Sequence, residues 1–241
     1  MNWLAWAWLP WRGSTTASSL APLPPGPTPS RNVLADLAVE SEAATVLMMR
    51  LAGATDRSVR GDASETVFKR LALAVSKYWV CKRWPAHTAE ALECLGGNGY
   101  VEESGMPRLF RESPLMSIWE GSGNVAALDV LRAMAKEPQA VEAFFTEVSA
   151  ATGADARLDD AVLRLRGELA DLEDMEMRAR RIVERMALVL QGSLLVRNGH
   201  PAVADAFCAS RLGGDWGHAL GTLPSGVDLA AIIARVTPKV N

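Results

Sequence analysis

The sequence predicts an all-α fold, an antiparallel bundle of long helices with a further C-terminal helical unit appended to it. From about position 32 onward, apolar residues recur at intervals of three and four, the spacing that places side chains on one face of a helix. No segment shows the alternation of apolar and polar residues that is typical of strands. The chain has 241 residues, of which 49% are apolar and 22% charged, so it can bury a globular core, which excludes a disulfide-stapled miniprotein.

Residues 1–30 differ in composition from the rest of the chain. They contain four of the eight tryptophans and no acidic residue, and five prolines lie between Pro22 and Pro29. Proline fixes its own φ and biases the preceding residue away from helix, so we expect an extended, disordered segment. A secretory signal peptide is the less favoured interpretation, because the only charged residue, Arg12, follows the apolar stretch and does not precede it.

Two long helices are predicted next. The first runs from Asn32 to near Gly53, because leucine, alanine and methionine form an apolar stripe along it. The second runs from Ser64 toward Leu95 on the same kind of pattern. We expect Pro85 to kink the second helix, because proline removes a backbone donor and crowds the preceding turn.

Shorter elements follow. Residues 96–112 are polar and punctuated by glycine, and Ser113-Pro114 predicts a cap and first-turn proline for a short apolar stretch. A loop at residues 120–123 precedes a helix that ends near Lys136.

Residues 138–241 are again helical in pattern. Apolar spacing predicts a long run from Leu158 to Val196, a helix that Pro201 opens, and a last helix that Ser225 opens.

The charge balance excludes a generally basic protein. Lys and Arg number 25 and Asp and Glu number 28, a formal net charge of -3, so affinity for nucleic acid requires a local patch. Cys81, Cys94 and Cys208 are odd in number and lack the spacing of metal ligands, which predicts no disulfide framework, no metal site and a reducing, cytoplasmic location. No apolar run approaches the roughly 20 residues that a membrane-spanning helix needs, so no membrane partner is expected.

A glycine-rich turn with Gly96, Gly97 and Gly99 ends the second predicted helix. Glycine accepts positive φ and close backbone contacts, so this turn can lie against a phosphate or another chain. On composition alone, a helix C-cap followed by a turn is the favoured interpretation.

Glu120 is the candidate general base. It lies between an apolar stretch and glycines, next to Trp119, and burial beside an aromatic ring raises the pKa of a carboxyl group toward the range that a base needs. The alternative is structural: a glutamate just before the helix that begins near Asn124 is stabilised by the helix dipole.

The segment ALECLGGNGYVEESGMPRLFRESPLMSIWEGSGNV resembles the C-terminal helical domain of the acyl-CoA dehydrogenase family, and within it the alkylation-response (AidB-like) branch. The segment RNVLADLAVESEAATVLMMRLA resembles the same branch. The resemblance covers residues 31–137, and residues 138–241 resemble, more loosely, the extra helical domain of that branch. Family members also carry an N-terminal helical domain and a middle β-domain. Residues 1–30 match neither, which implies a truncated form. A frameshift, a displaced start site and a gene remnant are the three explanations that stay open for these residues.

What the resemblance implies is specific. Members bind FAD, remove the α-proton of an acyl-CoA thioester with a carboxylate, and pass the β-hydrogen to the flavin as hydride. Glu120 is then the base, and the backbone of Glu120 and Gly121 faces the thioester carbonyl, where a donor stabilises the developing enolate-like charge. The implied FAD contacts form two groups, the first across a subunit interface: Glu93, Cys94, Leu95, Gly96 and Gly97, then Ser122, Gly123 and Asn124. Glu93 stands where many relatives carry Gln.

Two non-catalytic alternatives remain open. The extra helical domain of the alkylation-response branch is linked to DNA binding, and the one dense basic run here consists of Arg178, Arg180, Arg181 and Arg185. Weak DNA binding through these arginines competes with a solvated face of local ion pairs, since acidic residues lie among them. The other alternative is an oligomerisation unit, a homodimer or homotetramer, with Trp79, Trp84 and Trp119 in the interface or in the core.

Overall fold

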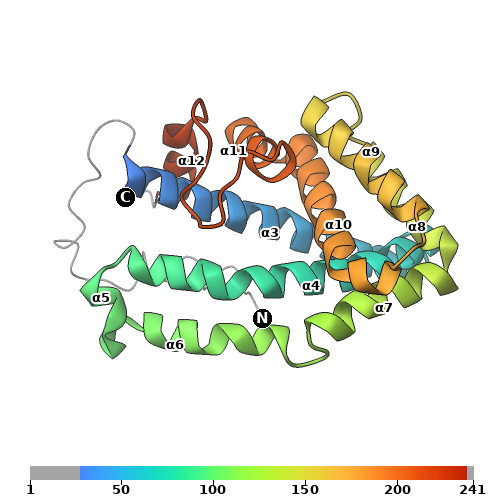
Figure 1. The fold of residues 1–241 in the computed structure, drawn as a ribbon, viewed down its shortest axis with the longest axis horizontal. Coiled ribbons are helices and arrows are strands. Elements are labelled where there is room, and N and C mark those ends of the chain that lie inside the picture. The colour runs from blue at the N-terminus through green and yellow to red at the C-terminus, as the bar shows by residue number, and fades with distance from the viewer. Residues whose placement is uncertain (1–27, 238–241) are drawn as a thin grey trace.

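The structure is a computed structural model, and it describes residues 28–237 (Figure 1). All regular secondary structure among these residues is helical, which confirms the predicted all-α class. Two helices of 31 residues each, α3 (Pro29–Val59) and α4 (Ala63–Glu93), are joined by a tight turn and pack side by side as an antiparallel pair. This pair is the frame on which the other elements lie.

The first helix is longer than the sequence predicts. Thr28 caps α3, with its side-chain oxygen accepting from the Arg31 amide at 3.4 Å, and Pro29 takes the first-turn position. The expected stop at Gly53 is wrong, because the helix continues to Val59. A single glycine costs a helix only about 1 kcal/mol, and apolar burial on either side of Gly53 outweighs that cost. The chain turns instead at Gly61, which has φ +95°.

The second helix is unbroken from Ala63 to Glu93. Asp62 caps it by accepting from the Glu65 amide at 3.2 Å. Pro85 lies within the helix, and the Thr88 hydroxyl donates to the carbonyls of Trp84 and Pro85 at 3.0 and 3.1 Å. The kink at Pro85 stays a prediction, but the proline does not end the helix.

The stretch after α4 is more regular than expected. It contains α5 (Gly97–Tyr100), the 3-10 turn η1 (Glu102–Ser104), α6 (Met106–Glu112) and the 3-10 turn η2 (Ser113–Ser117). The predicted cap at Ser113 is wrong: this serine is buried, and its hydroxyl donates to the Phe110 carbonyl at 2.7 Å, which ends α6. The helix α7 (Gly123–Lys136) ends at Lys136, as predicted.

The C-terminal elements follow in the order α8 (Pro138–Ser149), α9 (Ala156–Ala170), α10 (Met175–Asn198), α11 (Pro201–Phe207), the π-helical turn η3 (Cys208–Leu212) and α12 (Leu229–Val236). The start at Pro201 is confirmed. The predicted continuous run is wrong, because residues 171–174 interrupt it and Asp174 has φ +50°. The last helix begins later than Ser225, because Asp228 supplies the cap by accepting from the Ala231 amide at 2.9 Å.

One cluster of buried apolar side chains extends from α3 to α12. Helix α10 lies at its centre: it packs against α3, α4 and α7, and Ile182, Met186 and Leu190 are fully buried (Figure 1). Residues 29–137 and the appended C-terminal helices therefore share one core. The boundary at 137/138 falls between α7 and α8 and stays a prediction from the sequence.

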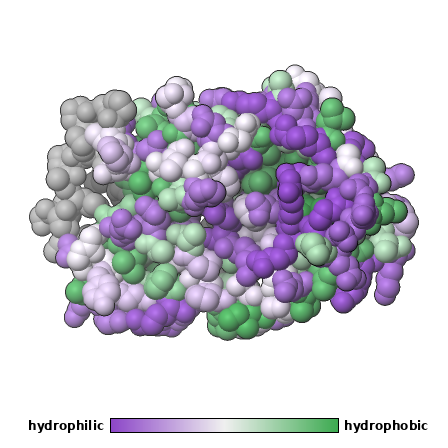
Figure 2. Space-filling model, in the orientation of Figure 1, coloured by the Kyte–Doolittle hydropathy of each residue, from purple (hydrophilic) through white to green (hydrophobic). Residues whose placement is uncertain are grey.

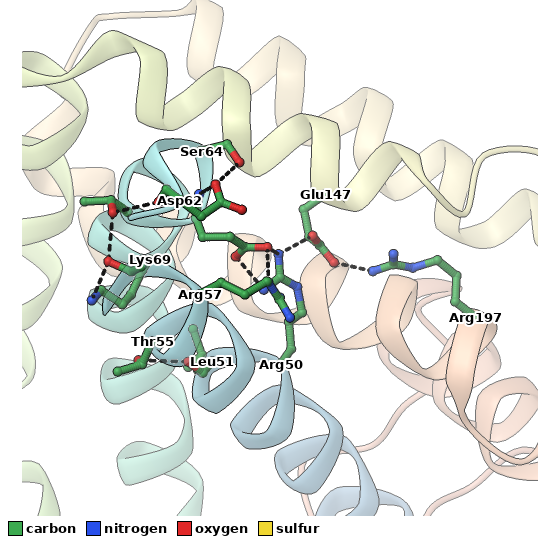
Figure 3. A network of polar contacts seen from close by, with 12 residues as sticks. Arg50, Leu51, Thr55, Arg57, Asp62, Ser64, Lys69, Glu147 and Arg197 are labelled. Atoms are coloured by element: carbon green, nitrogen blue, oxygen red, sulfur yellow. Dashed lines mark hydrogen bonds and ion pairs between the residues drawn. The ribbon is translucent and has the colours of Figure 1, made fainter. Parts of the chain in front are cut away.

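An ionic network joins four of these helices (Figure 3). Arg50 of α3 donates to Glu65 of α4 at 2.8 Å and to Glu147 of α8 at 2.7 Å, and Glu147 also accepts from Arg197 of α10 at 2.5 Å. Burial acts to raise the pKa of Glu147, but the guanidinium groups of Arg50 and Arg197 outweigh it and lower that pKa. The carboxylate is therefore held in its charged form where the four helices meet.

Candidate active site

The candidate base lies on a constrained loop between η2 and α7. Glu120 has φ +56° and Gly121 has φ +110°, so two consecutive residues occupy the left-handed region. For a residue with a Cβ atom this conformation costs about 1–2 kcal/mol. The predicted burial of Glu120 beside Trp119 is wrong, because Ile118, Trp119 and Glu120 are all exposed. The Glu120 carboxylate accepts no hydrogen bond from any residue within 28–237. The loop therefore presents an uncommitted carboxylate on a strained backbone.

Lys77 of α4 hydrogen-bonds to the backbone of this loop. Its Nζ donates to the Trp119 carbonyl at 3.1 Å and also to the Gly121 carbonyl. These two carbonyls flank Glu120, so a single ammonium group fixes the backbone on both sides of the candidate base. Hydrogen bonds from a charged donor contribute about 1.5–3 kcal/mol each, which is enough to offset the strain at Glu120.

The N-terminus of α7 forms the other side of the loop. Ser122 is the N-cap residue, but its hydroxyl makes no capping hydrogen bond. A Cβ at Gly123 would lie 2.5 Å from Cε and 3.1 Å from Nζ of Lys82, so the lysine packs directly on the glycine backbone. Unpaired amides at a helix N-terminus beside an ammonium group favour a bound anion.

The predicted dipole contact is weak in this geometry. Glu120 lies two residues before the N-cap Ser122, outside the first turn of α7, and its carboxylate accepts no amide of that helix among the described residues. The stabilisation that a helix N-terminus gives to a carboxylate falls off beyond the first turn.

An apolar groove of about 370 Å³ lies between α3 and α4, with Glu120 among the residues that line it. Its walls are mainly apolar: Ala44, Leu47, Met48, Leu51, Leu73, Trp79, Val80, Trp84, Met116 and Trp119. Trp119 is 51% exposed, whereas Trp79 is 5% exposed and belongs to the core. Figure 2 shows apolar residues along the lower edge of the molecule, where α6 and α7 meet in Figure 1.

Charged groups line one end of the groove. Arg83 donates to Glu40 at 3.1 Å, and Arg211 donates to Glu40 at 3.1 Å. Burial acts to raise the pKa of Glu40, but the two arginines outweigh it and lower that pKa. His87 lies at the same end, where burial lowers its pKa. At this end of the groove the carboxylate of Glu40 is paired with the two arginines. The rest of the groove is apolar.

The first predicted FAD segment lies at the end of α4. Glu93 is the last residue of the helix, Gly96 has φ +56°, and the Gly96 amide donates to the Glu93 carbonyl at 2.8 Å, which is a helix C-cap. Burial and the neighbouring carboxylates raise the pKa of the Cys94 thiol to about 11. A Cβ at Gly97 would meet nothing within 4 Å, so the backbone there is open to a ligand or another chain.

The two predicted FAD segments are far apart along α4. Lys77 contacts the Glu120 loop, and Glu93 follows 16 residues later, a separation of about 24 Å at the rise of an α-helix. In Figure 1, α5 and the adjoining turn lie at the far left end of α4, away from the start of α7. The structure therefore does not bring Ser122, Gly123 and Asn124 together with the stretch from Glu93 through Leu95 to Gly97 in one chain.

The four candidate DNA-binding arginines do not share one free face. Arg178 donates to backbone carbonyls at the end of α9, and Arg180 donates to the Tyr78 hydroxyl at 3.1 Å. Arg181 and Arg185 pair with Glu168, beside a cavity of about 590 Å³ between α9 and α10. The guanidinium groups of these arginines are thus already paired within the chain. DNA binding stays a prediction.

Within residues 28–237, no group of three His, Cys, Asp or Glu side chains is arranged to hold a metal ion. None of the helices in the same range is long and apolar enough to cross a membrane.

Sequence reasoning missed Lys77 and the groove. A lone lysine on an amphipathic helix is typical of a solvated face, and its partners lie more than 40 positions away in the sequence. The sequence offered the tryptophans of the groove as members of a subunit interface or of the core, and not as the walls of a groove. No signal in a single sequence distinguishes these alternatives, because both depend on how η2 folds back on α4.

Comparison with known proteins gives consistent relatives. Residues 29–135 match the family described as "Acyl-CoA dehydrogenase, C-terminal domain". The chain is 40% identical to "Putative acyl-CoA dehydrogenase AidB" of Escherichia coli (strain K12) over 178 residues, 74% of this chain and 32% of that protein. It is 32% identical to "Acyl-CoA dehydrogenase family member 11" of Caenorhabditis elegans over 133 residues, 54% of this chain and 21% of that one.

A solved structure is also similar. The crystal structure of Caenorhabditis elegans ACDH-11 in complex with C11-CoA superposes with a TM-score of 0.63 at 25% identity, over 70% of this chain and 34% of that chain. The present chain thus spans about a third, or less, of the length of these relatives.

Proposed function

Residues 29–135 are a C-terminal domain of the acyl-CoA dehydrogenase family, and from that premise we propose that this chain supplies the base and part of the FAD site of an acyl-CoA-oxidising flavoenzyme. The observation that carries the proposal is the position of Glu120, an uncommitted carboxylate on a positive-φ loop at an apolar groove. The reaction class is oxidation of the CH–CH bond of an acyl-CoA thioester.

Glu120 acts as the base. Its carboxylate takes the α-proton as the α C–H bond breaks, and the electron pair left behind moves toward the thioester carbonyl. The backbone of Glu120 and Gly121 would face the thioester carbonyl, where an amide donor stabilises the enolate-like charge. FAD, when bound, supplies the acceptor for the β-hydrogen and its electron pair. The apolar walls of the groove favour an acyl chain.

The residues around the N-terminus of α7 are suited to the FAD diphosphate or ribityl groups. Ser122 has an uncommitted hydroxyl, Gly123 permits close backbone approach, and Asn124 is exposed on the first turn. Lys82 adds a positive charge at the same place. A hydroxyl, an amide and an ammonium group beside a helix N-terminus are donors that suit an anionic group, which supports the FAD assignment that the family implies.

The first predicted FAD segment, at the end of α4, supports a homo-oligomer. Because Glu93 and Gly97 lie about 24 Å along α4 from the Glu120 loop, we assign the turn at Gly97 to the adenosine part of an FAD that a second copy holds. A homodimer, alone or within a homotetramer, is therefore part of the proposal. The cytoplasmic location is also part of it, in keeping with three free cysteines.

The test is the visible absorption spectrum of the purified, desalted chain, followed by titration with FAD under fluorescence detection. A flavin spectrum or saturable FAD quenching is expected, and Glu120→Gln should retain FAD while losing bleaching of the flavin by an acyl-CoA. A folded, colourless chain that does not quench FAD would overturn the proposal.

A further inference from the structure

We propose that Lys77 is the positioning residue of the candidate active site, because it sets the backbone conformation that aims the Glu120 carboxylate at the groove. This inference rests on the proposed function for its catalytic meaning. Its structural content, that one lysine of α4 holds the loop, stands on separate observations.

The geometry singles out this lysine. Its Nζ donates to the carbonyls of Trp119 and Gly121, the residues immediately before and after Glu120. Among residues 28–237, no other side chain hydrogen-bonds to the backbone of residues 119–121. Among the described residues, Lys77 is therefore the one side chain that hydrogen-bonds the backbone on either side of Glu120 to α4.

Glu120 depends on that tie for its orientation. Its own carboxylate has no hydrogen-bond partner in the described chain, so the backbone is what sets the direction in which the side chain leaves the loop. At φ +56°, the backbone of a residue with a Cβ atom is unfavourable and returns to negative φ when nothing opposes it. Such a return would swing the carboxylate away from the groove.

The anchor itself is rigid. Leu71 and Val75, within two turns before Lys77, are fully buried, and Tyr78 and Trp79 directly after it are buried in the same core. Lys77 thus projects from a fixed helix to a loop that has few other contacts. A rigid donor on a packed helix is the arrangement that places a reacting group reproducibly.

The test uses the full chain labelled with 5-fluorotryptophan, with the Trp119 resonance assigned through Trp119→Phe. Lys77→Met keeps the length and apolar stem of the side chain but removes both hydrogen bonds, and we expect the ¹⁹F resonance of Trp119 to shift or broaden. Lys69→Met is the matched control: it lies on the same helix, and its Nζ donates to Ser58 at 3.2 Å, away from the loop. It should leave the Trp119 resonance unchanged.

A second variant separates loop positioning from a general folding defect. Because glycine adopts positive φ without cost, Lys77→Met combined with Glu120→Gly should return the Trp119 resonance toward its native position. A Trp119 resonance that does not move in Lys77→Met would overturn the proposal, as would an equal shift in Lys69→Met.

Kinetics separate this inference from the proposed function. If the native chain oxidises an acyl-CoA, Lys77→Met should lower kcat about 100-fold with KM changed less than about threefold, since a misplaced base impairs the reaction more than it impairs binding. Lys77→Arg, which keeps the charged donor, should recover most of the rate. Retention of kcat in Lys77→Met would overturn the catalytic role. Absence of flavin and turnover in the native chain would overturn the proposed function, while the NMR result still decides whether Lys77 holds the loop.

Discussion

Arg211 donates a buried hydrogen bond to Asp36, a residue 175 positions earlier in the chain. Both side chains are almost completely buried, at 1% and 0% exposure. Asp36 also accepts from the Gly221 amide at 2.8 Å. One carboxylate of α3 therefore binds both the π-helical turn η3, through Arg211, and the segment after it, through Gly221. A buried carboxylate with these partners fixes where the C-terminal segment lies on the α3–α4 pair.

Removing the charge at Arg211 should destabilise the chain strongly. Arg211→Met leaves the buried Asp36 without its charged partner, and the expected loss in unfolding free energy is about 3–5 kcal/mol. Chemical denaturation followed by circular dichroism measures it. The control is Arg235→Met, because Arg235 pairs with Glu42 on α3 at 2.8 Å in a more exposed position and should cost less than about 1 kcal/mol. Equal losses would contradict the prediction.

Glu147 should make the chain sensitive to acid. Its pKa is lowered in the folded state from the ordinary value of 4.5, so its contribution to stability is fully present above pH 4.5 and is lost as the pH falls further. Glu147→Gln should cost about 2 kcal/mol at pH 7 and flatten the decline in unfolding free energy below pH 4.5. The exposed Glu142 on the same helix gives the control, since Glu142→Gln should leave the decline unchanged.

His87 should act in a higher pH window. Burial lowers its pKa below the ordinary value of 6.5, so the unfolded chain takes up a proton at a pH where the folded chain does not. Stability from this group is present above pH 6.5 and is lost as the pH falls from there. Denaturation midpoints between pH 7.5 and 5 should decline, and His87→Gln should reduce that decline. The exposed His218 provides the comparison, and a flat native profile would refute the expectation.

Gly221 should tolerate no side chain. It has φ +81°, and a Cβ there would overlap Val33 of α3 and lie 3.3 Å from the Val33 Cα. Gly226 has a similar φ of +95° but nothing within 4 Å, so Gly226→Ala measures the backbone strain alone. Thermal unfolding should show Gly221→Ala less stable than Gly226→Ala by about 1–3 kcal/mol, the usual cost of overpacking.

Gly97 should matter for cofactor binding and not for folding. A Cβ there meets nothing within this chain, so Gly97→Ala should leave the melting temperature within about 2 °C, the shift that well under 1 kcal/mol produces. If this turn approaches the FAD of a second copy, the same variant should weaken FAD affinity about tenfold, which is about 1.4 kcal/mol. Gly167→Ala, also in open space but within α9, should leave the FAD affinity unchanged and raise the melting temperature, because alanine is more favourable than glycine in a helix by about 1 kcal/mol.

Local signals in the sequence predicted the helices well where burial and capping agreed. The start at Pro201 and the end at Lys136 follow from such signals. Gly53 failed as a stop because the burial of its neighbours is a tertiary effect. The last helix begins at Asp228 and not at Ser225 for a related reason, since both residues can cap and only packing selects between them.

The site was predictable in part. The motif around Glu120 identified the loop, but it did not give its left-handed backbone or the contact with Lys77. Likewise, the run from Arg178 to Arg185 resembled a basic patch. Its partners are carbonyls at and just after the end of α9, the Glu168 carboxylate and the Tyr78 hydroxyl, which only the fold brings near. Contacts between distant segments leave no trace in the local pattern.

The central place of α10 has a consequence for the order in which the protein can fold during synthesis. The α3–α4 pair leaves the ribosome first, yet much of its apolar face is closed by Ile182, Met186 and Leu190, which are translated about a hundred residues later. Until then the nascent hairpin presents uncovered apolar surface, a feature of chains whose folding depends on distant contacts. Translation of α10 therefore covers much of this surface, and α11 and α12 complete the core after it.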